Sequence, residues 1–364
     1  MQIKTGNLIY NTSDKTELYK DNIHIVVGID NNYVQQCAVT IVSALLNTSA
    51  DYYFTFHIMN VGLNSTNKIK LESLKKFRPF DIYYEDLSHC DFSKFPLNRD
   101  WISSATYYRL FLPDVISSNI DKCIYMDTDM IVEDNIGELW EYDIDNYLAG
   151  VVEDENSRIN QERLNLNSNN YFNAGLLLLN LKRIREYKII DKAIEYYIQN
   201  KEKISLQDQD ILNGIMDGKC KFLPLRWNIN TPAYMGEKVQ HFYSKDEEHY
   251  AAQNPAILHF TGKFKPWYSY CMHPLRKEYE RYLKLTGFNE DIKKYQQKEI
   301  FAKFYCWKKY WDSQTLYIFN TPIYKKETGK NSFIENIFSI KNSKDKSHKI
   351  ITILGIKISI MRKK

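Results

Sequence analysis

A nearly continuous apolar run close to the start of the chain constrains its fold more than any other feature. The run is IHIVVGID at 23–30, and it has the pattern of a strand that is buried on both faces of a parallel sheet. A second strand-like run, FTFHIM, follows at 54–59. Between the two, apolar residues recur at helical spacing, namely Val34, Cys37, Ala38, Ile41, Val42 and Leu45. The order strand, helix, strand predicts the opening of an α/β sheet.

The same alternation continues to about residue 288. It predicts further strands at 81–87, 122–129, 147–153, 172–181, 220–225 and 256–260, and helices at 69–77, 104–110, 183–200 and 207–216. We therefore expect one compact α/β unit at 22–288, preceded by a polar extension at 1–21. The sequence contains no signal-peptide core and no run of eighteen apolar residues. Neither secretion by the usual route nor a membrane span is expected.

The remainder, 289–364, has a different composition. Residues 297–364 hold 15 Lys and Arg against 5 Asp and Glu, whereas the whole chain has a net charge of +4. The aromatic and Lys residues at 301–319 fit an interfacial helix, and the alternation around Gly355 fits a strand or short hairpin. We predict a membrane-attachment region that binds an anionic membrane surface and no nucleic acid. The protein would then be cytoplasmic and peripheral on the inner face of the cytoplasmic membrane, unless this end is a disordered, solubilising tail.

The six cysteines are widely separated, and no CxxC pair occurs among them. Several lie in apolar runs, where a thiol behaves as a small hydrophobic group. We interpret them as free thiols in a reducing compartment.

Two acidic residues stand where a predicted strand ends. They belong to Asp127-Thr128-Asp129, and alternate residues of a strand face the same way. Both carboxylates would therefore point beyond the carboxyl edge of the sheet, where ligands of open α/β sheets bind. Two hard oxygen ligands suit Mg²⁺ or Mn²⁺ shared with a diphosphate. Because such a pair also occurs in ordinary turns, it does not identify the site by itself.

A second polar cluster follows the last predicted strand of the α/β unit, in the sequence HFTGKFKPW at 259–267. His259 would complete the metal site from a remote part of the chain. Gly262 would let the backbone approach a phosphate closely, and Lys265 would place a positive charge on it. A structural role for His259 is the alternative, which the combination with Asp127 and Asp129 disfavours.

Six sequence blocks, in order, resemble the retaining family 8 glycosyltransferases, and most of all the bacterial lipooligosaccharide galactosyltransferases. The blocks lie within 22–285 and read GIDNNY, ATYYRL, YMDTDM, YFNAGLLLLNL, QDQDILN and LHFTGKFKPW. The resemblance implies a glycosyltransferase A fold, in which helices flank a Rossmann-like mixed sheet. It also implies a UDP-sugar donor, Mn²⁺, and transfer with retained anomeric configuration to an oligosaccharide or glycolipid acceptor. The sequence does not distinguish UDP-galactose from UDP-glucose.

The resemblance also assigns roles to individual residues. It implies that Asp127, Asp129 and His259 bind the metal. The donor-binding residues that it implies are Asp30, Asn32, Tyr33, Thr106, Arg109, Thr128, Asn173, Ala174, Gly175, Asp208, Gly262 and Lys265. An ordinary polar turn remains the alternative for the first three of these, and a structural ion pair remains the alternative for Arg109.

The reaction mechanism depends on Gln209, which the resemblance places near the anomeric carbon. An amide is a poor nucleophile compared with the carboxylates of retaining glycosidases, so front-face substitution is favoured. Asp208 as a transient nucleophile is the less favoured version, and Asp208 could instead cap a helix. The polar segment 151–170 would form a lid or a plain loop, with Glu153 or Asp154 reaching the acceptor.

Two other classes of protein compete with this interpretation. A sugar nucleotidyltransferase would also use paired Asp residues and Mg²⁺, but it normally has a basic, Gly-rich loop after the first strand. GIDNNY is acidic and polar instead. A non-catalytic nucleotide- or glycan-binding module is the second alternative, and a complete set of metal ligands argues against it.

Overall fold

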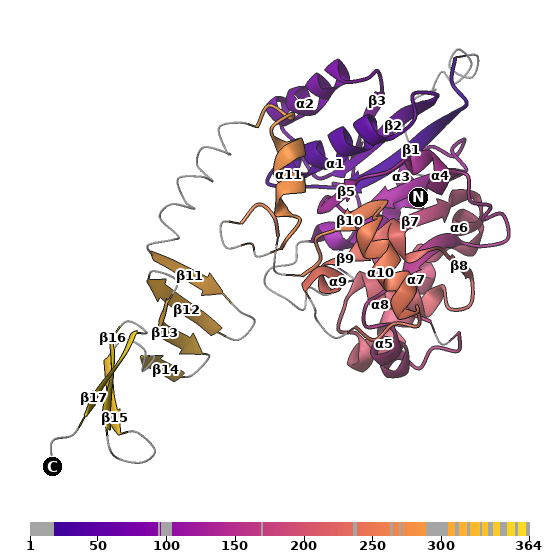
Figure 1. Ribbon diagram of the computed structural model, residues 1–364. Helices are drawn as coiled ribbons and strands as arrows, with labels where there is room; N and C mark the ends of the chain where they lie inside the picture. The colour runs from indigo at the N-terminus through magenta and orange to yellow at the C-terminus, as the bar shows by residue number, and fades with distance from the viewer. Residues whose placement is uncertain are drawn as a thin grey trace. The chain divides into compact units, whose positions relative to one another are not determined.

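The structure is a computed structural model that describes residues 18–93, 95, 104–168, 170–235, 239–262, 265–268, 271 and 273–288, together with the backbone of strands between 305 and 361. The chain divides into two compact units, residues 1–265 with 273–288 and residues 266–272 with 289–364. Figure 1 shows both, and each unit is described here by itself.

The first unit is built on a seven-stranded mixed sheet with the order β3-β2-β1-β4-β7-β6-β8. Its strands are β1 (Asp21–Gly28), β2 (Tyr52–Asn60), β3 (Asp81–Asp86), β4 (Lys122–Met126), β6 (Ala149–Glu153), β7 (Phe172–Asn180) and β8 (Cys220–Phe222). Strands β3, β2, β1 and β4 are parallel, whereas β7 is antiparallel to β4 and to β6. All the strands predicted for this sheet are confirmed, although several are shorter than the apolar runs.

Eleven α-helices of the described residues flank the sheets. They are α1 (Val34–Asn47), α2 (Ser65–Glu72), α3 (Tyr108–Val115), α4 (Ile136–Trp140), α5 (Ser157–Leu164), α6 (Leu181–Tyr187), α7 (Ile189–Asn200), α8 (Asp208–Ile215), α9 (Thr231–Met235), α10 (Lys245–Gln253) and α11 (Arg276–Leu283). Helix α1 packs against α2 and α11, as Figure 1 shows. The helix predicted at 183–200 is two helices, because Lys188 between them has a left-handed backbone with φ of 53°.

A small second sheet pairs two strands, one after β4 and one near residue 258, that are far apart in the sequence. Strands β5 (Met130–Val132), β10 (Ile257–His259) and β9 (Ile229–Asn230) form it in the order β5-β10-β9. Its antiparallel β5–β10 pairing puts His259 opposite Met130, the residue after Asp129. The sequence predicted β10 but neither this sheet nor its other strands, since two or three residues carry no readable periodicity.

The polar segment 151–170 is more regular than the predicted lid or loop. It begins in β6 and contains α5, which ends at Asn165 in a left-handed conformation with φ of 58°. The helix turns its few buried residues, Ser157, Asn160 and Leu164, inward. A helix with so little apolar surface gives only a weak signal in the sequence.

The second unit contains two antiparallel sheets. One has the order β11-β12-β13-β14, with β11 (Tyr305–Lys309), β12 (Ser313–Ile318), β13 (Thr321–Glu327) and β14 (Lys330–Phe333), and the other has the order β15-β16-β17, with β15 (Phe338–Asn342), β16 (His348–Ile353) and β17 (Ile356–Met361). The predicted interfacial helix at 301–319 is wrong, because β11 and β12 occupy its described part. Aromatic residues at alternate positions, Tyr305 and Trp307, fit a strand better than a helix. The alternation around Gly355 predicted a strand or a short hairpin, and the antiparallel pairing of β16 with β17 confirms the hairpin.

Two further expectations concern the described residues. Cys37, Cys90, Cys123 and Cys220 are free thiols, in agreement with the prediction. None of the helices in this part of the chain combines the length and the apolar content that a membrane span requires.

Candidate active site

Three side chains from two remote segments meet beyond the carboxyl end of β4. Asp127 and Asp129 follow β4, and His259 is the last residue of β10. One ligand atom from each lies within 4.8 Å of the others. Two carboxylates and one imidazole are a suitable donor set for Mn²⁺ or Mg²⁺, so the residues fit a divalent cation. The structure therefore brings together the three residues that the sequence indicated as metal ligands.

Both carboxylates of this cluster are paired with cations of the protein. Lys265 forms an ion pair with Asp129 and also donates to the carbonyl oxygen of Phe260 at 2.7 Å. The Nη2 atom of Arg109 donates to Asp127 at 2.8 Å. Burial alone would raise the pKa of Asp129, but the neighbouring Lys265 and His259 lower it. Asp129 is therefore an anion, ready to bind a cation.

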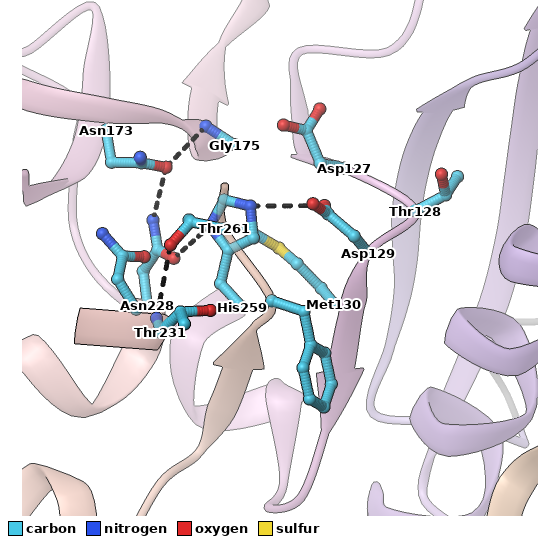
Figure 2. A network of polar contacts seen from close by, with 12 residues as sticks. Asp127, Thr128, Asp129, Met130, Asn173, Gly175, Asn228, Thr231, His259 and Thr261 are labelled. Atoms are coloured by element: carbon cyan, nitrogen blue, oxygen red, sulfur yellow. Dashed lines mark hydrogen bonds and ion pairs between the residues drawn. The ribbon is translucent and has the colours of Figure 1, made fainter. Parts of the chain in front are cut away.

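A chain of buried amides fixes the tautomer of His259 (Figure 2). The Oδ1 atom of Asn173 accepts from the Gly175 N–H at 3.0 Å and from Nδ2 of Asn228 at 3.1 Å. Since Asn228 donates there, it turns its oxygen to Nδ1 of His259, 2.9 Å away. His259 therefore carries a proton on Nδ1, and its Nε2 atom lies 3.2 Å from Oδ1 of Asp129. A metal-binding histidine is held in this way, with Nδ1 donating to a protein oxygen and Nε2 facing the metal site.

Gly175 is required by the space around the cluster. A Cβ atom at this position would lie 2.4 Å from Cε1 of His259 and 3.0 Å from Oδ2 of Asp127. No side chain fits there without displacing His259 or Asp127. This crowding explains the glycine of the YFNAGLLLLNL block on steric grounds, since it lets β7 pass close behind the cluster.

A pocket of about 170 Å³ adjoins the cluster. Its lining residues are Thr106, Arg109, Asp127, Asn173, Ala174, Gly175, Ser205, Leu206, Gln207, Asp208, Gln209 and His259. Nine of these were predicted as metal-binding, donor-binding or catalytic residues from segments far apart in the sequence.

Helix α8 supplies the two residues that were predicted to be catalytic. Asp208 is buried, with Nε of Arg109 3.1 Å from its Oδ2 and with Thr106 donating to its Oδ1. Burial raises the pKa of Asp208, and the Arg109 charge opposes that shift. The Oε1 atom of Gln209 accepts from the Ala174 N–H at 3.0 Å. The carboxylate is therefore neutralised by internal partners, and the amide is held in a fixed place.

Other predicted residues lie outside the pocket lining. Asp30, Asn32 and Tyr33 follow β1, where Asp30 accepts from the backbone N–H of Asn32 at 2.7 Å. Thr128 is buried, and its carbonyl oxygen accepts from Thr40. Gly262 has φ of 70°, a conformation that favours glycine. Their predicted roles in donor binding stay predictions.

The two predicted acceptor residues are buried. Glu153 accepts from the backbone N–H of Phe242 at 2.9 Å. Asp154 accepts from Nδ2 of Asn173 and Nε2 of Gln209, both at 3.2 Å. Neither lines the pocket, so a direct contact with the acceptor stays a prediction for both.

The sequence missed three residues of the pocket lining, Ser205, Leu206 and Gln207, and two supporting residues, Asn228 and Tyr171. The hydrogen bonds of the two supporting residues depend on tertiary packing. Asn228 and Asn230 alternate at the start of β9, a period-two signal like that of Asp127 and Asp129. Gln207 has a strained backbone with φ of 51°, and its buried Nε2 atom has no hydrogen-bond partner among the described residues. An unpaired donor beside the pocket suggests a ligand contact.

Comparison with known proteins gives consistent results. The family model "Glycosyl transferase family 8" matches residues 24–271. General stress protein A of Bacillus subtilis is 31% identical over 278 residues, which cover 74% of this chain and 96% of that protein. Lipopolysaccharide 1,2-glucosyltransferase of Escherichia coli is 25% identical over 281 residues, covering 74% and 80% respectively.

A solved structure agrees with this result. The galactosyltransferase LgtC, in complex with donor and acceptor sugar analogues, superimposes with a TM-score of 0.64 at 28% identity and covers 72% of this chain and 95% of its own. This chain is a member of glycosyltransferase family 8, and its mixed sheet with flanking helices is a glycosyltransferase A fold.

Proposed function

We propose that this protein is a retaining, metal-dependent hexosyltransferase that moves galactose or glucose from a UDP-sugar to a carbohydrate acceptor. The acceptor would belong to a cell-surface glycan such as lipooligosaccharide. The observation that carries the proposal is the Asp127, Asp129 and His259 cluster, which adjoins a pocket lined by sugar-binding residue types. The relatives named for glucosyl and galactosyl transfer support both sugars as candidates.

The cluster side of the pocket would hold the diphosphate. A bound Mn²⁺ ion would supply Lewis-acid neutralisation of the leaving nucleotide's charge. Lys265 forms an ion pair with Asp129. When the donor binds, its ammonium group would pair with a phosphate oxygen instead. Arg109 would keep Asp127 and Asp208 in place through its two ion pairs.

The opposite side of the pocket would hold the sugar. Asn173 and Asp208 offer short polar groups that bond to adjacent hydroxyls. Asp208 is neutralised by Arg109, which makes it a poor nucleophile and favours front-face substitution. The acceptor hydroxyl would attack from the side on which UDP departs, and the leaving phosphate oxygen would take its proton.

The decisive experiment measures UDP release from a panel of UDP-sugars without acceptor, in the presence of Mn²⁺ and after EDTA treatment. Slow donor hydrolysis needs only the donor site. We expect metal-dependent release from UDP-galactose or UDP-glucose and none from the other sugars. Asp217→Asn is a matched control, since this carboxylate binds the backbone N–H groups of Asn167 and Ser168 outside the pocket.

Two outcomes would contradict the proposal. Metal-dependent release of pyrophosphate from a sugar 1-phosphate and UTP would identify a sugar nucleotidyltransferase instead. Tight UDP binding without turnover, with or without an oligosaccharide acceptor, would indicate a non-catalytic nucleotide- or glycan-binding module.

We also propose that residues 289–364 attach the enzyme to an anionic membrane surface on the cytoplasmic side. The register of β15, β16 and β17 supports a two-sided sheet, because directly paired residues share a face. One face holds the positions of Phe338, Ile340, Ile351, Ile353, Ile356, Ile358 and Ile360 together with Asn342 and Lys349. The other holds those of Ser339, Lys341, His348, Ile350, Thr352, Lys357, Ser359 and Met361. A mainly apolar face with basic residues at its edge and on the opposite face suits an anionic lipid surface.

Liposome sedimentation tests this second proposal. The full chain should bind vesicles containing phosphatidylglycerol, and binding should weaken as the salt concentration rises. The double variant Ile351→Lys/Ile358→Lys, which places two charges on the mainly apolar face, should lose vesicle binding while it keeps UDP-sugar hydrolysis. Binding that is unaffected by these substitutions would assign the membrane contact to another part of the chain.

A further inference from the structure

We propose that Asp154 is a positioning residue that, together with Tyr171, holds the Gln209 amide so that only its carbonyl oxygen is open to the pocket. The inference rests on the proposed function and deepens it. It gives Asp154 a role behind the pocket in place of direct contact with the acceptor.

The hydrogen bonds of Gln209 leave its amide one orientation. Both N–H groups of Nε2 are occupied, one by Oδ2 of Asp154 and one by the hydroxyl oxygen of Tyr171, each at 3.2 Å. Oε1 accepts from the backbone N–H of Ala174 at 3.0 Å. A carbonyl oxygen has two lone pairs, so one acceptor position remains, and Gln209 lines the pocket.

Asp154 accepts hydrogen bonds only. Besides Gln209, its carboxylate accepts from Nδ2 of Asn173 at 3.2 Å and from the backbone N–H of Asn156 at 2.9 Å. Burial raises the pKa of both carboxyl groups of the acidic pair Asp154 and Glu155. Hydrogen bonds from Asn156, Asn173 and Gln209 oppose that shift at Asp154, whereas the Asp154 charge adds to it at Glu155, so the proton of the pair lies on Glu155. An ionised Asp154 then turns both amides, Gln209 and Asn173, with their nitrogens towards itself.

Tyr171 is fixed from the other side. Its hydroxyl donates to Oδ1 of Asp210 at 2.7 Å, so its oxygen is left to accept from Gln209. Arg163 binds both oxygens of Asp210, at 2.7 and 2.9 Å. Asp210 is fully buried and also accepts from the backbone N–H groups of Ser205 and Leu206. This anchored carboxylate prevents Tyr171 from reversing its hydrogen bond.

Reversal of the Gln209 amide would be unfavourable at all three contacts. Its oxygen would face the carboxylate of Asp154, and its nitrogen would face the N–H of Ala174. A buried pair of unmatched polar groups costs on the order of 1–3 kcal/mol. The Oε1 atom of Gln209 therefore presents a partial negative charge to the pocket. This charge would stabilise positive charge on the anomeric carbon as the bond to UDP breaks.

The same buried chain continues to the metal cluster. Asn173, turned by Asp154, accepts from Asn228, and Asn228 accepts from His259. Figure 2 shows the part of the chain from Asn173 to His259. Asp154 thus sets hydrogen-bond directions both at Gln209 and towards His259.

A double-mutant cycle tests the contact between Gln209 and Asp154. The Gln209→Glu variant places a second carboxyl group against Asp154, and this group must keep a proton to stay there. Its kcat for UDP-sugar hydrolysis should fall roughly 10²-fold as the pH rises from 6 to 9, with little change in KM. In Gln209→Glu/Asp154→Asn, the new amide donates to the new carboxylate, so the fall should move to lower pH.

A second readout does not depend on catalysis. The Tm of Gln209→Glu should decrease with rising pH, and Asp154→Asn should remove most of that decrease. Tyr187→Phe, which removes a hydroxyl that donates to the carbonyl of Ile215 outside the pocket, controls for loss of one buried hydrogen bond.

Each outcome is decisive. Additive effects of the two substitutions on Tm would overturn the inferred contact, whatever the enzyme does. Coupled Tm values in a protein that hydrolyses no UDP-sugar would contradict the proposed function while the contact stands. Coupled Tm values with an unchanged kcat profile would reject the positioning role of Asp154.

Discussion

The two sides of the pocket are stabilised by different interactions. The metal side is charged: Asp127 and Asp129 are paired with Arg109 and Lys265, which are cations of the protein. The proposed sugar side is built mainly from neutral amides, and at its centre both N–H groups of the Gln209 amide are paired within the protein.

This difference indicates how each side responds to a ligand. If a divalent cation and a diphosphate bind there as proposed, Lys265 must leave Asp129 or share it, so the metal side would rearrange. The amides are already held in one orientation by internal hydrogen bonds, so the proposed sugar side would be preorganised. Substitutions on the metal side should therefore affect binding most, and those on the sugar side should affect catalytic rate.

The largest effect is expected from removal of a metal ligand. Asp129→Ala or His259→Ala should abolish Mn²⁺-dependent UDP binding, because either change removes one of three ligands. Isothermal titration calorimetry with and without Mn²⁺ measures this. Circular dichroism should show an intact fold. If UDP binding kept the wild-type affinity, the metal would have to bind at another site.

A methyl group at Gly175 should have nearly as large an effect. In Gly175→Ala the added Cβ meets His259 at 2.4 Å, so the imidazole or β7 must shift. We expect loss of Mn²⁺ affinity and a stability decrease of about 1–3 kcal/mol from overpacking. Manganese titration followed by electron paramagnetic resonance, together with urea unfolding, measures both. Wild-type affinity would mean that His259 does not bind the metal.

A smaller effect is expected when the amide chain is cut and the ligands are left intact. Asn228→Ala removes the acceptor for Nδ1 of His259, and this should weaken Mn²⁺ binding roughly 10–100-fold. Asn180→Ala is the matched control, since Asn180 caps α6 away from the pocket. The control should lose about 1 kcal/mol of stability with unchanged metal affinity. Equal metal affinities in both variants would contradict the supporting role of Asn228.

The sequence predicted the charged side of the pocket better than the amide side. Asp127 and Asp129 follow a long apolar strand, and a strand end together with a period of two suffices to bring both carboxylates to the edge of the sheet. His259 could be added because β10 is also apolar. The small sheet that brings it to the carboxylates has strands too short to show a pattern.

The amide chain could not be predicted because its members contact one another only in the folded chain. Asn228 and Tyr171 lie far from Gln209 in sequence, and Asn and Tyr occur commonly in turns and cores. The lid prediction for 151–170 missed α5 because this helix is polar on most of its surface. At 301–319 the aromatic residues suggested a helix, although their alternation was that of a strand.

The smallest predicted effect concerns stability and pH on the amide side. Burial and the Asp154 charge raise the pKa of Glu155 above its ordinary value, so the folded state binds this proton more tightly than the unfolded chain does. The resulting stabilisation is complete at acidic pH and is lost as the pH rises through the folded-state pKa. Glu155→Gln should therefore make the urea midpoint less dependent on pH at neutral and alkaline values.

A carboxylate with the opposite shift provides the comparison. Burial alone would raise the pKa of Asp217, but hydrogen bonds from Ser168 and Asn167 lower it. Its stabilisation is present at neutral pH and is lost as the pH falls below the ordinary carboxyl range. Asp217→Asn should thus flatten the acidic limb of the stability profile and leave the alkaline limb unchanged. If Glu155→Gln also altered only the acidic limb, Glu155 would be ionised at neutral pH. The proton of the pair would then lie on Asp154, which contradicts its role as an acceptor for Gln209.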